Sequence, residues 1–401
     1  SVSVGWNVSN EPFWDADKTE LKIRASYGRT GNQDGISNYG WQALISGGVN
    51  YGGQSGIAIS SRGKHKLTWE TADQYNAGFD LSFLGGKINM IADVYLKNTN
   101  NLLYSKPVHA TTGETSILSN IGSMRNKGVE FTINTHFNLG KVAWSSSLNI
   151  ARNVNKLTSL LEDDMLAIGS NRALKIGKTV GSWYIFRKDG IYQYDGEVPQ
   201  ALYDKGVRAG DVKYWDRNGD GDITDDDRIV TGNPNPKFSG GWNNTFKYKG
   251  WELSLFFTYS YGNDVFASWM TPCAKPGYTR SLLKQFADNR WTGPGTTNEY
   301  PRAIYSYSGW NSKNGTNLLT DGSFIRLRSL TLGYTFPQRM INKIHLKGLR
   351  LYAQGDNLFL CSRYPGWDPE TSVNLDPRFY GEDNDGVPQP RIFKVGLNIT
   401  F

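Results

Sequence analysis

The side chains best suited to chemistry in this chain lie in one short acidic segment with the spacing D-x-N-x-D-G-x5-D. Oxygens at the first, third and fifth positions of such a loop can converge on one hard cation, and the glycine permits a sharp turn. Asp occupies the twelfth position, where the calcium-loop pattern usually has a bidentate Glu. The spacing therefore predicts a structural Ca²⁺ with Gly221 at the turn and these ligands: Asp216, Asn218, Asp220, Asp222 and Asp227.

An alternative for this segment is a turn rich in Asn, Gly and Asp that binds nothing and is held by bonds from its side chains to its backbone. Its flanks indicate a strand and a Pro-rich loop, not the two helices of a calcium sensor. A bound ion would stiffen the long connection 152–236. The second acidic turn, Glu382 to Gly386, is too short for a full ligand set.

Candidate catalytic groups are poorly supported. The chain has four histidines without local metal-ligand spacing, and it has neither a Gly-x-Ser-x-Gly elbow nor a phosphate-binding Gly/Lys loop. Asp368 and Glu370 are close in sequence, but such pairs are too common to indicate glycoside hydrolysis. We predict that the protein is not an enzyme.

Tryptophans in the predicted long connections are the candidates for contact with a substrate. Sugar rings stack on aromatic faces because an apolar C–H face meets a π surface. The alternative is that these rings pack the long connections against one another or lie at a membrane interface. The candidates for the substrate path are Trp41, Trp183, Trp310 and Trp367.

The elements that position these groups are strands. In residues 391–401, apolar residues alternate with polar ones up to the last residue. This is the pattern of a strand with one apolar face. The closing strand of an outer-membrane barrel has this pattern, with lipid-facing residues in alternation and an aromatic at the interface. The apolar row of this strand is Phe393, Val395, Leu397, Ile399 and Phe401.

Similar alternation predicts about eleven strands. Short turns and long connections alternate between them, as periplasmic turns and extracellular loops do in outer-membrane barrels. An additional hairpin within 182–194 is an alternative reading of one connection. The predicted strands are 1–9, 21–27, 77–83, 88–97, 129–137, 142–150, 238–246, 251–259, 330–336, 349–353 and 391–401. The predicted long connections are about 30–73, 98–126, 152–236, 261–322 and 359–390.

Composition agrees with a barrel. The 401 residues are 38% hydrophobic, with 45 glycines and 13 tryptophans, and no apolar run approaches the ~18 residues of a transmembrane helix. A large soluble β protein is the alternative. The net charge of +7 comes from scattered residues, which excludes a clustered nucleic-acid footprint. Two cysteines, Cys273 and Cys361, do not make a disulfide framework.

An open sheet of about eleven strands leaves two unpaired edges, and unpaired backbone in hydrocarbon costs several kcal/mol per group. Bacterial single-chain barrels usually have an even number of strands. The chain also begins within a strand pattern and carries no signal peptide. We therefore expect the C-terminal part of a longer chain whose other strands complete the barrel.

Several segments, in order along the chain, resemble the C-terminal half of the SusC/RagA-like TonB-dependent transporters of the Bacteroidetes outer membrane. They are LKIRASYGRTGNQ (21–33), NKGVEFTIN (126–134), GDVKYWDRNGDGDIT (210–224), DRIVTGNPNPKFSGGWNNTFKYKGWELSLFF (227–257), DGSFIRLRSLTLGYTFP (321–337), GLRLYAQGDNLF (348–359), GWDPE (366–370) and PQPRIFKVGLNITF (388–401).

The resemblance implies an all-β fold: a transmembrane antiparallel barrel of roughly 22 strands, of which this chain supplies about eleven, with a plug domain that is absent here. It also implies a SusD-like surface lipoprotein as partner, coupling to TonB-ExbB-ExbD through the absent N-terminal part, and a possible dimer of SusC–SusD pairs. No nucleic acid is expected as a partner.

We expect TonB-dependent import of oligosaccharides across the outer membrane, with the barrel in contact with lipid. One alternative is a different transport class, namely import of peptides or siderophores, or a passive porin. Another is a secreted, calcium-stiffened β protein that binds glycans.

Overall fold

The computed structural model describes residues 1–15, 19–61, 63, 67–109, 111, 116–160, 164–273, 283–304, 309–342 and 345–401. Within these residues, no helix is long and apolar enough to cross a membrane. The chain divides into two compact units, which are described separately. The first is Ser1–His136, Asn149–Met165 and Lys175–Thr179; the second is Phe137–Leu148, Leu166–Leu174 and Val180–Phe401.

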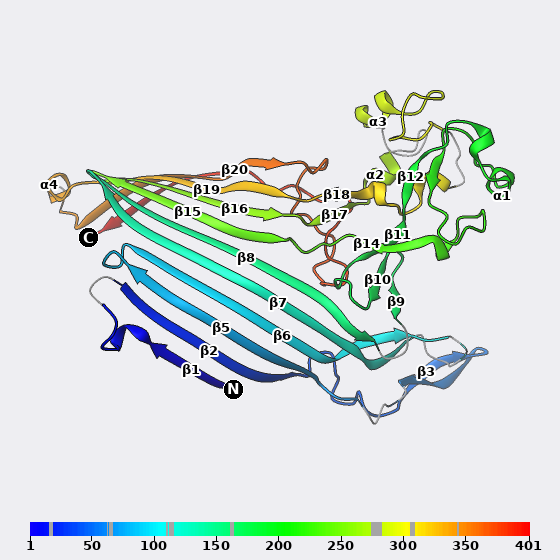
Figure 1. Cartoon of the computed structure of the whole chain (residues 1–401), viewed down its shortest axis with the longest axis horizontal. Helices are drawn as coiled ribbons and strands as arrows, with labels where there is room; N and C mark the ends of the chain where they lie inside the picture. The colour runs from blue at the N-terminus through cyan, green and yellow to red at the C-terminus, as the bar shows by residue number, and fades with distance from the viewer. Residues whose placement is uncertain are drawn as a thin grey trace. The chain divides into compact units, whose positions relative to one another are not determined.

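The first unit is a meander of long antiparallel strands, each paired with the next along the sheet (Figure 1). A two-stranded hairpin, β3 (Leu44–Tyr51) and β4 (Gln54–Ser61), lies in the connection after the second strand, and η1 (Val8–Asn10) follows the first. The sheet strands are β1 (Val2–Asn7), β2 (Thr19–Asn32), β5 (Glu70–Phe83), β6 (Ile88–Pro107), β7 (Ser116–Leu139) and β8 (Val142–Leu160), the last two continuing into the second unit.

Glycine on the polar face of this sheet makes room for charged side chains to reach across a strand. Gly78 of β5 pairs with Arg24 on one side and Asp93 on the other. Arg24 Nη2 lies 2.9 Å from Asp80 Oδ1 and 3.1 Å from Asp93 Oδ1. A Cβ at Gly78 would lie 2.1 Å from Asp93 Oδ1. The glycine is thus required by the ion pair that crosses over it.

The second unit continues the same pattern, and the hydrogen-bonded order is β1-β2-β5-β6-β7-β8-β15-β16-β19-β20-β22. This order confirms the predicted eleven strands. The remaining sheet strands are β15 (Phe238–Tyr248), β16 (Trp251–Tyr261), β19 (Phe324–Thr335), β20 (Gly348–Ser362) and β22 (Ile392–Thr400).

The predicted connection 98–126 is too long. β6 and β7 run on to Pro107 and back from Ser116, and their pairing passes through irregularities between Thr99 and Leu103. The polar residues from Asn98 to Asn101 break the apolar alternation but not the backbone ladder, because pairing depends on main-chain groups. Side-chain period alone therefore ended both strands too early.

The long connections of the second unit carry their own secondary structure. The predicted hairpin within 182–194 is wrong, because β11 pairs with β14 and β12 pairs with β13. A four-stranded sheet has the order β14 (Arg228–Thr231), β11 (Trp183–Phe186), β10 (Arg172–Lys175) and β9 (Met165–Ile168). A two-stranded sheet pairs β12 (Lys188–Ile191) with β13 (Val212–Tyr214). A three-stranded sheet has the order β18 (Leu319–Asp321), β17 (Asp264–Ala267) and β21 (Glu382–Asp383). The short helices are η3 (Asp195–Glu197), α1 (Gln200–Asp204), η4 (Asp225–Asp227), α2 (Met270–Cys273), α3 (Lys284–Asn289), η5 (Trp310–Ser312), η6 (Thr316–Leu318) and α4 (Gln338–Ile341).

The hydrophobic core of the second unit lies in these connections rather than on the sheet. Two clusters of buried side chains fill them, and both draw on segments far apart in sequence. The first cluster is Trp183, Ile185, Val265, Phe266, Ala267, Met270, Phe286, Leu318 and Tyr364. The second is Phe186, Tyr192, Val198, Leu202, Val207, Val212, Tyr214, Ile223 and Trp310. We call this folded part of the second unit the loop domain.

The last strand has the opposite character. All five residues of its predicted apolar row are exposed: Phe393, Val395, Leu397, Ile399 and Phe401. β22 pairs with β20 through a continuous register from Thr400 to Ile392. Among the described strands, none pairs with its other edge. An apolar exposed row beside a polar one is what a lipid-facing strand presents.

Candidate functional site

Two of the four tryptophans predicted to face a substrate are buried in the loop domain. Trp183 has no exposed surface, and its ring stacks on Phe266 at a centroid distance of 6.3 Å. Trp310 is 8% exposed, and its Nε1 donates to the carbonyl of Val212 at 2.8 Å. For these two residues, the prediction of contact with a substrate is contradicted by burial. They pack the connections together, which was the alternative.

The other two tryptophans are open to solvent. Trp41, in the first unit, is 51% exposed, and Trp367, in the second, is 80% exposed. Their role in the substrate path stays a prediction. The two belong to different units, so they are considered one at a time.

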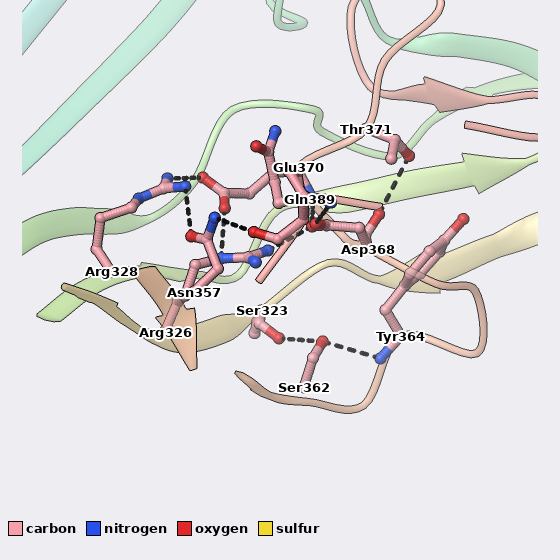
Figure 2. A network of polar contacts seen from close by, with 11 residues as sticks. Ser323, Arg326, Arg328, Asn357, Ser362, Tyr364, Asp368, Glu370, Thr371 and Gln389 are labelled. Atoms are coloured by element: carbon pink, nitrogen blue, oxygen red, sulfur yellow. Dashed lines mark hydrogen bonds and ion pairs between the residues drawn. The ribbon is translucent and has the colours of Figure 1, made fainter. Parts of the chain in front are cut away.

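Next to Trp367, the acidic pair Asp368 and Glu370 lies in a network of ion pairs (Figure 2). Arg326 Nη2 donates to Asp368 Oδ1 at 2.5 Å, and its Nε lies 2.7 Å from Glu370 Oε2. Arg328 Nη2 donates to the other oxygen of Glu370 at 2.7 Å. The side chains of Arg326 and Asp368 are 3% and 2% exposed. A carboxylate pair that is neutralised by two arginines, with one of its members buried, is suited to anchoring and not to proton transfer.

This network fastens the connection after β20 to the polar face of β19. Main-chain N–H groups of Glu370 and Gln389 donate to Asp368 at 3.0 and 3.1 Å, and Asn357 Nδ2 donates to the carbonyl of Pro390 at 2.9 Å. The sequence reasoning missed Arg326 and Arg328. The available signal was two arginines on the polar side of a strand whose neighbouring connection carries two carboxylates.

A second buried arginine fastens the same connection at another point. Arg172 of β10 donates from Nη1 to the carbonyl of Gly181 at 2.5 Å and from Nη2 to the carbonyls of Phe379 and Tyr380 at 3.1 and 3.0 Å. Its guanidinium also lies 4.2 Å from the ring centroid of Trp183. Burial lowers the pKa of Arg172 to about 10, with Glu382 opposing the shift, so the side chain remains charged at neutral pH. Sequence gave no signal for this residue.

The predicted calcium segment forms a tight loop closed by its own hydrogen bonds. Asp216 accepts the N–H groups of Gly219 at 2.6 Å and Gly221 at 2.8 Å. Asp227, fully buried, accepts those of Arg217 and Thr224, both at 2.8 Å. Asp227 also completes a capping box with Thr224 at the start of η4.

The remaining predicted ligands are Asn218 and Asp220, which are exposed, and Asp222, which is partly exposed. Asp220 Oδ1 accepts the N–H of Asp222 at 2.8 Å, and Asn218 Nδ2 donates to Asp220 Oδ2 at 2.8 Å. Asp222 is paired with Lys205, which lowers the pKa of the Asp222 carboxyl. In the part of the chain that the structure describes, no three His, Cys, Asp or Glu side chains are grouped so that they could hold a metal ion. A bound cation would have to share the Asp216, Asp220 and Asp227 oxygens with the N–H groups that already donate to them. Each has a lone pair left for this, since one N–H occupies only part of a carboxylate oxygen.

A cavity of about 250 Å³ lies between elements of the loop domain. Its wall combines amines and amides with apolar and aromatic surface. Burial lowers the pKa values of Lys188 and Lys313, the two amines of the wall. The lining residues are Lys188, Val212, Met270, Thr271, Phe286, Glu299, Tyr300, Pro301, Asn311, Lys313, Thr316, Asn317 and Leu318. The cavity can hold a group the size of about eight waters.

Comparison with known proteins agrees with the class that the long antiparallel meander indicates, an outer-membrane β-barrel. The family described as TonB dependent receptor-like, beta-barrel, matches residues 1–358. TonB-dependent receptors P3 and P26 of Formosa agariphila are 31% and 33% identical over the whole of this chain, which spans 41% and 42% of them. TonB-dependent receptor SusC of Bacteroides thetaiotaomicron is 28% identical over the whole chain, which spans 40% of it.

Among solved structures, the RagAB peptide transporter shares the fold, with a TM-score of 0.82 and 23% identity over the whole chain and 43% of the matched chain. The chain belongs to the TonB dependent receptor-like β-barrel family, and it is an outer-membrane protein rather than an enzyme. The SusC/RagA resemblance is thereby confirmed. The chain spans about two fifths of the length of the curated relatives it matches.

Proposed function

We propose that this chain forms half of the barrel wall of a TonB-dependent importer that takes oligosaccharides across the outer membrane. A SusD-like lipoprotein would cover its mouth, and TonB-ExbB-ExbD would supply energy through a part of the protein outside this sequence. Family membership and the relation to SusC support the transport class and the lipoprotein partner. The oligosaccharide, the pairing and the coupling are the proposal.

The observation that carries the proposal is the folded loop domain. Passive diffusion requires only a water-filled lumen, whereas selective import requires connections held in one arrangement at the mouth. Here two buried clusters and the anchors Arg172 and Arg326 hold the connections of the second unit. This favours an importer over a porin.

The exposed ring of Trp367 supports a sugar as the substrate, because a pyranose presents apolar C–H faces to an aromatic plane. Peptide import is the second candidate, and the cavity supports it. A peptide carboxylate would suit the amines Lys188 and Lys313, and an apolar side chain would suit Phe286 and Tyr300.

The first experiment is purification from outer membranes with co-purifying partners, followed by intact mass and peptide mapping. A mass far above the 44.9 kDa of this sequence, together with a SusD-like lipoprotein, is the expected result. A second step compares uptake of labelled hexasaccharides and of labelled hexapeptides in cells with and without tonB. Loss of sugar uptake without TonB supports the proposal. Uptake of peptides alone, or uptake that does not require TonB, contradicts it.

We also propose that the acidic loop binds a structural Ca²⁺ through Asp216, Asn218, Asp220, Asp222 and Asp227. Binding would stabilise the folded loop by about 2.7 kcal/mol at a calcium concentration 100-fold above Kd. Hydrogen exchange of peptides covering 210–230, with calcium or with a chelator, measures this. Protection that rises with Ca²⁺ in the native protein and not in an Asp216→Asn variant supports the site. Equal exchange under both conditions would mean that the loop is closed by its own bonds alone.

A further inference from the structure

The segment around Trp367 combines an exposed ring with a rigid backbone. Trp367 is 80% exposed, yet the next residue, Asp368, is 1% exposed and Tyr364, three residues before, is 7% exposed. Here a large apolar side chain is held out between two buried anchors.

The N-terminal anchor is built on Tyr364. Its hydroxyl donates to Asp383 Oδ2 at 2.5 Å and accepts from Trp269 Nε1 at 3.0 Å. Its main-chain N–H donates to Ser362 Oγ at 3.1 Å. Gly366 lies so close to the Tyr364 ring that a Cβ would come within 2.4 Å of it. The residue that precedes Trp367 therefore packs directly on the anchor.

The C-terminal anchor is Asp368 itself. Arg326 Nη2 and two main-chain N–H groups donate to its carboxylate, and Thr371 Oγ1 donates to its carbonyl at 3.1 Å (Figure 2). Glu370, bonded to Arg328, holds the backbone two residues farther on. With the backbone fixed on both sides, a ligand that stacks on Trp367 orders only one side chain with two rotatable bonds, so little conformational entropy is lost on binding.

We propose that Trp367 is a stacking platform for one pyranose ring of the oligosaccharide, and that Arg326 and Asp368 are positioning residues that hold it. This inference rests on the proposed function. The polar network that holds Asp368 also contains groups that suit a sugar: Gln389 is exposed and its main-chain N–H donates to Asp368, and the side chain of Arg328, bonded to Glu370, is 33% exposed. Planar amide and guanidinium groups pair with neighbouring hydroxyls, while the indole covers the C–H face.

The test uses the protein purified with its lipoprotein and labelled with 5-fluorotryptophan. The probes are maltohexaose, laminarihexaose and cellohexaose, with affinity measured by calorimetry. Trp367→Phe identifies the ¹⁹F resonance of Trp367. Trp367→Ala is expected to weaken binding of the preferred probe about tenfold, while Trp367→Phe retains most of the affinity. Trp69→Ala, which removes another exposed ring in the first unit, is the matched control and should bind as the native protein does.

The positioning role is tested by a double-mutant cycle. Arg326→Met alone should weaken binding and broaden the Trp367 resonance, but it should have no further effect on affinity when Trp367 is already Ala. If the Trp367→Ala variant binds the preferred probe as tightly as the native protein does, the platform is overturned and the proposed function stands. Failure of all three probes to bind the native protein overturns the oligosaccharide proposal, and the platform with it.

Discussion

Two acidic segments of the second unit, 216–227 and 368–370, satisfy their carboxylates in opposite ways. In the first, the partners are mostly main-chain N–H groups of the same loop. In the second, they are the guanidinium groups of Arg326 and Arg328, which belong to a strand about forty residues earlier in the chain. The first segment contains Asp, Asn and Gly at calcium-loop spacing, whereas the second has only two acids two positions apart.

The difference shows why an acidic motif alone does not define a site. Guanidinium nitrogens lie 2.7 Å from each oxygen of Glu370 and neutralise the charge of the pair, so this pair is suited to anchoring. Main-chain N–H groups leave the charge of Asp216 and Asp227 in place, so that loop retains a local excess of negative charge. Availability for a cation therefore depends on the partners of the carboxylates, and the local sequence does not specify the partners of Asp368 and Glu370.

The largest effect on local stability should come from removing an arginine that neutralises Asp368 and Glu370. Arg326→Met leaves the buried carboxylate of Asp368 without its cation, which costs about 3–5 kcal/mol in comparable cases. The loss should appear locally, as a lower opening free energy of peptides covering 363–391 in hydrogen exchange, because β19 and β20 remain paired through their backbones.

The matched control is an exposed arginine pair in the same connection. Arg378 pairs with Asp376 at 2.5 Å, with side chains 39% and 28% exposed. Arg378→Met should lower the opening free energy by no more than about 1 kcal/mol. Similar losses for Arg326→Met and Arg378→Met would show that burial of the first cluster contributes nothing.

A smaller effect should follow from a substitution at Asp227, the buried carboxylate of the segment 216–227. Asp227→Asn replaces one acceptor oxygen with an amide donor that faces an N–H of Arg217 or Thr224. The cost of one unsatisfied buried group is about 1–3 kcal/mol. Exchange of the amides of Arg217 and Thr224 should accelerate accordingly, while peptides from 363–391 stay unchanged. Acceleration in both segments would mean that the two clusters open as one cooperative part.

Most of the strand order could be predicted from sequence because an antiparallel meander depends on local information. The alternation of apolar and polar residues predicts the eleven strands, and short turns such as Gly85-Gly86 predict which neighbouring strands pair. The ends of β6 and β7 were wrong because main-chain pairing continues where side chains become polar. The small sheets of the loop domain could not be predicted, since β11 pairs with β14 some forty residues farther on.

The site was less predictable because it depends on contacts that are distant in sequence. Trp183 and Trp367 look alike in the sequence, yet one is enclosed by Phe266 and Arg172 and the other is held outward by Tyr364 and Asp368. Arg172 reaches residues more than two hundred positions away. Only the acidic loop, whose hydrogen bonds are local, could be predicted as a closed loop from its spacing.

The smallest effect should come from the ion pair between Asp222 and Lys205, and it depends on pH. The ion pair with Lys205 lowers the folded-state pKa of Asp222, so the pair contributes stability above the unfolded value of about 3.9 and loses it as the pH falls through the folded pKa. Both partners are partly exposed, which limits the contribution to a few tenths of a kcal/mol up to about 1 kcal/mol. Exchange of peptides covering 205–228, corrected for intrinsic rate, should therefore show a loss of protection that begins near the unfolded value of about 3.9 and continues as the pH falls below it. Lys205→Gln should remove most of this loss, because it takes away the partner and leaves the other carboxylates of the loop in place. If the native protein and the Lys205→Gln variant lose protection equally, the acid response of the loop belongs to its backbone-held carboxylates rather than to this ion pair.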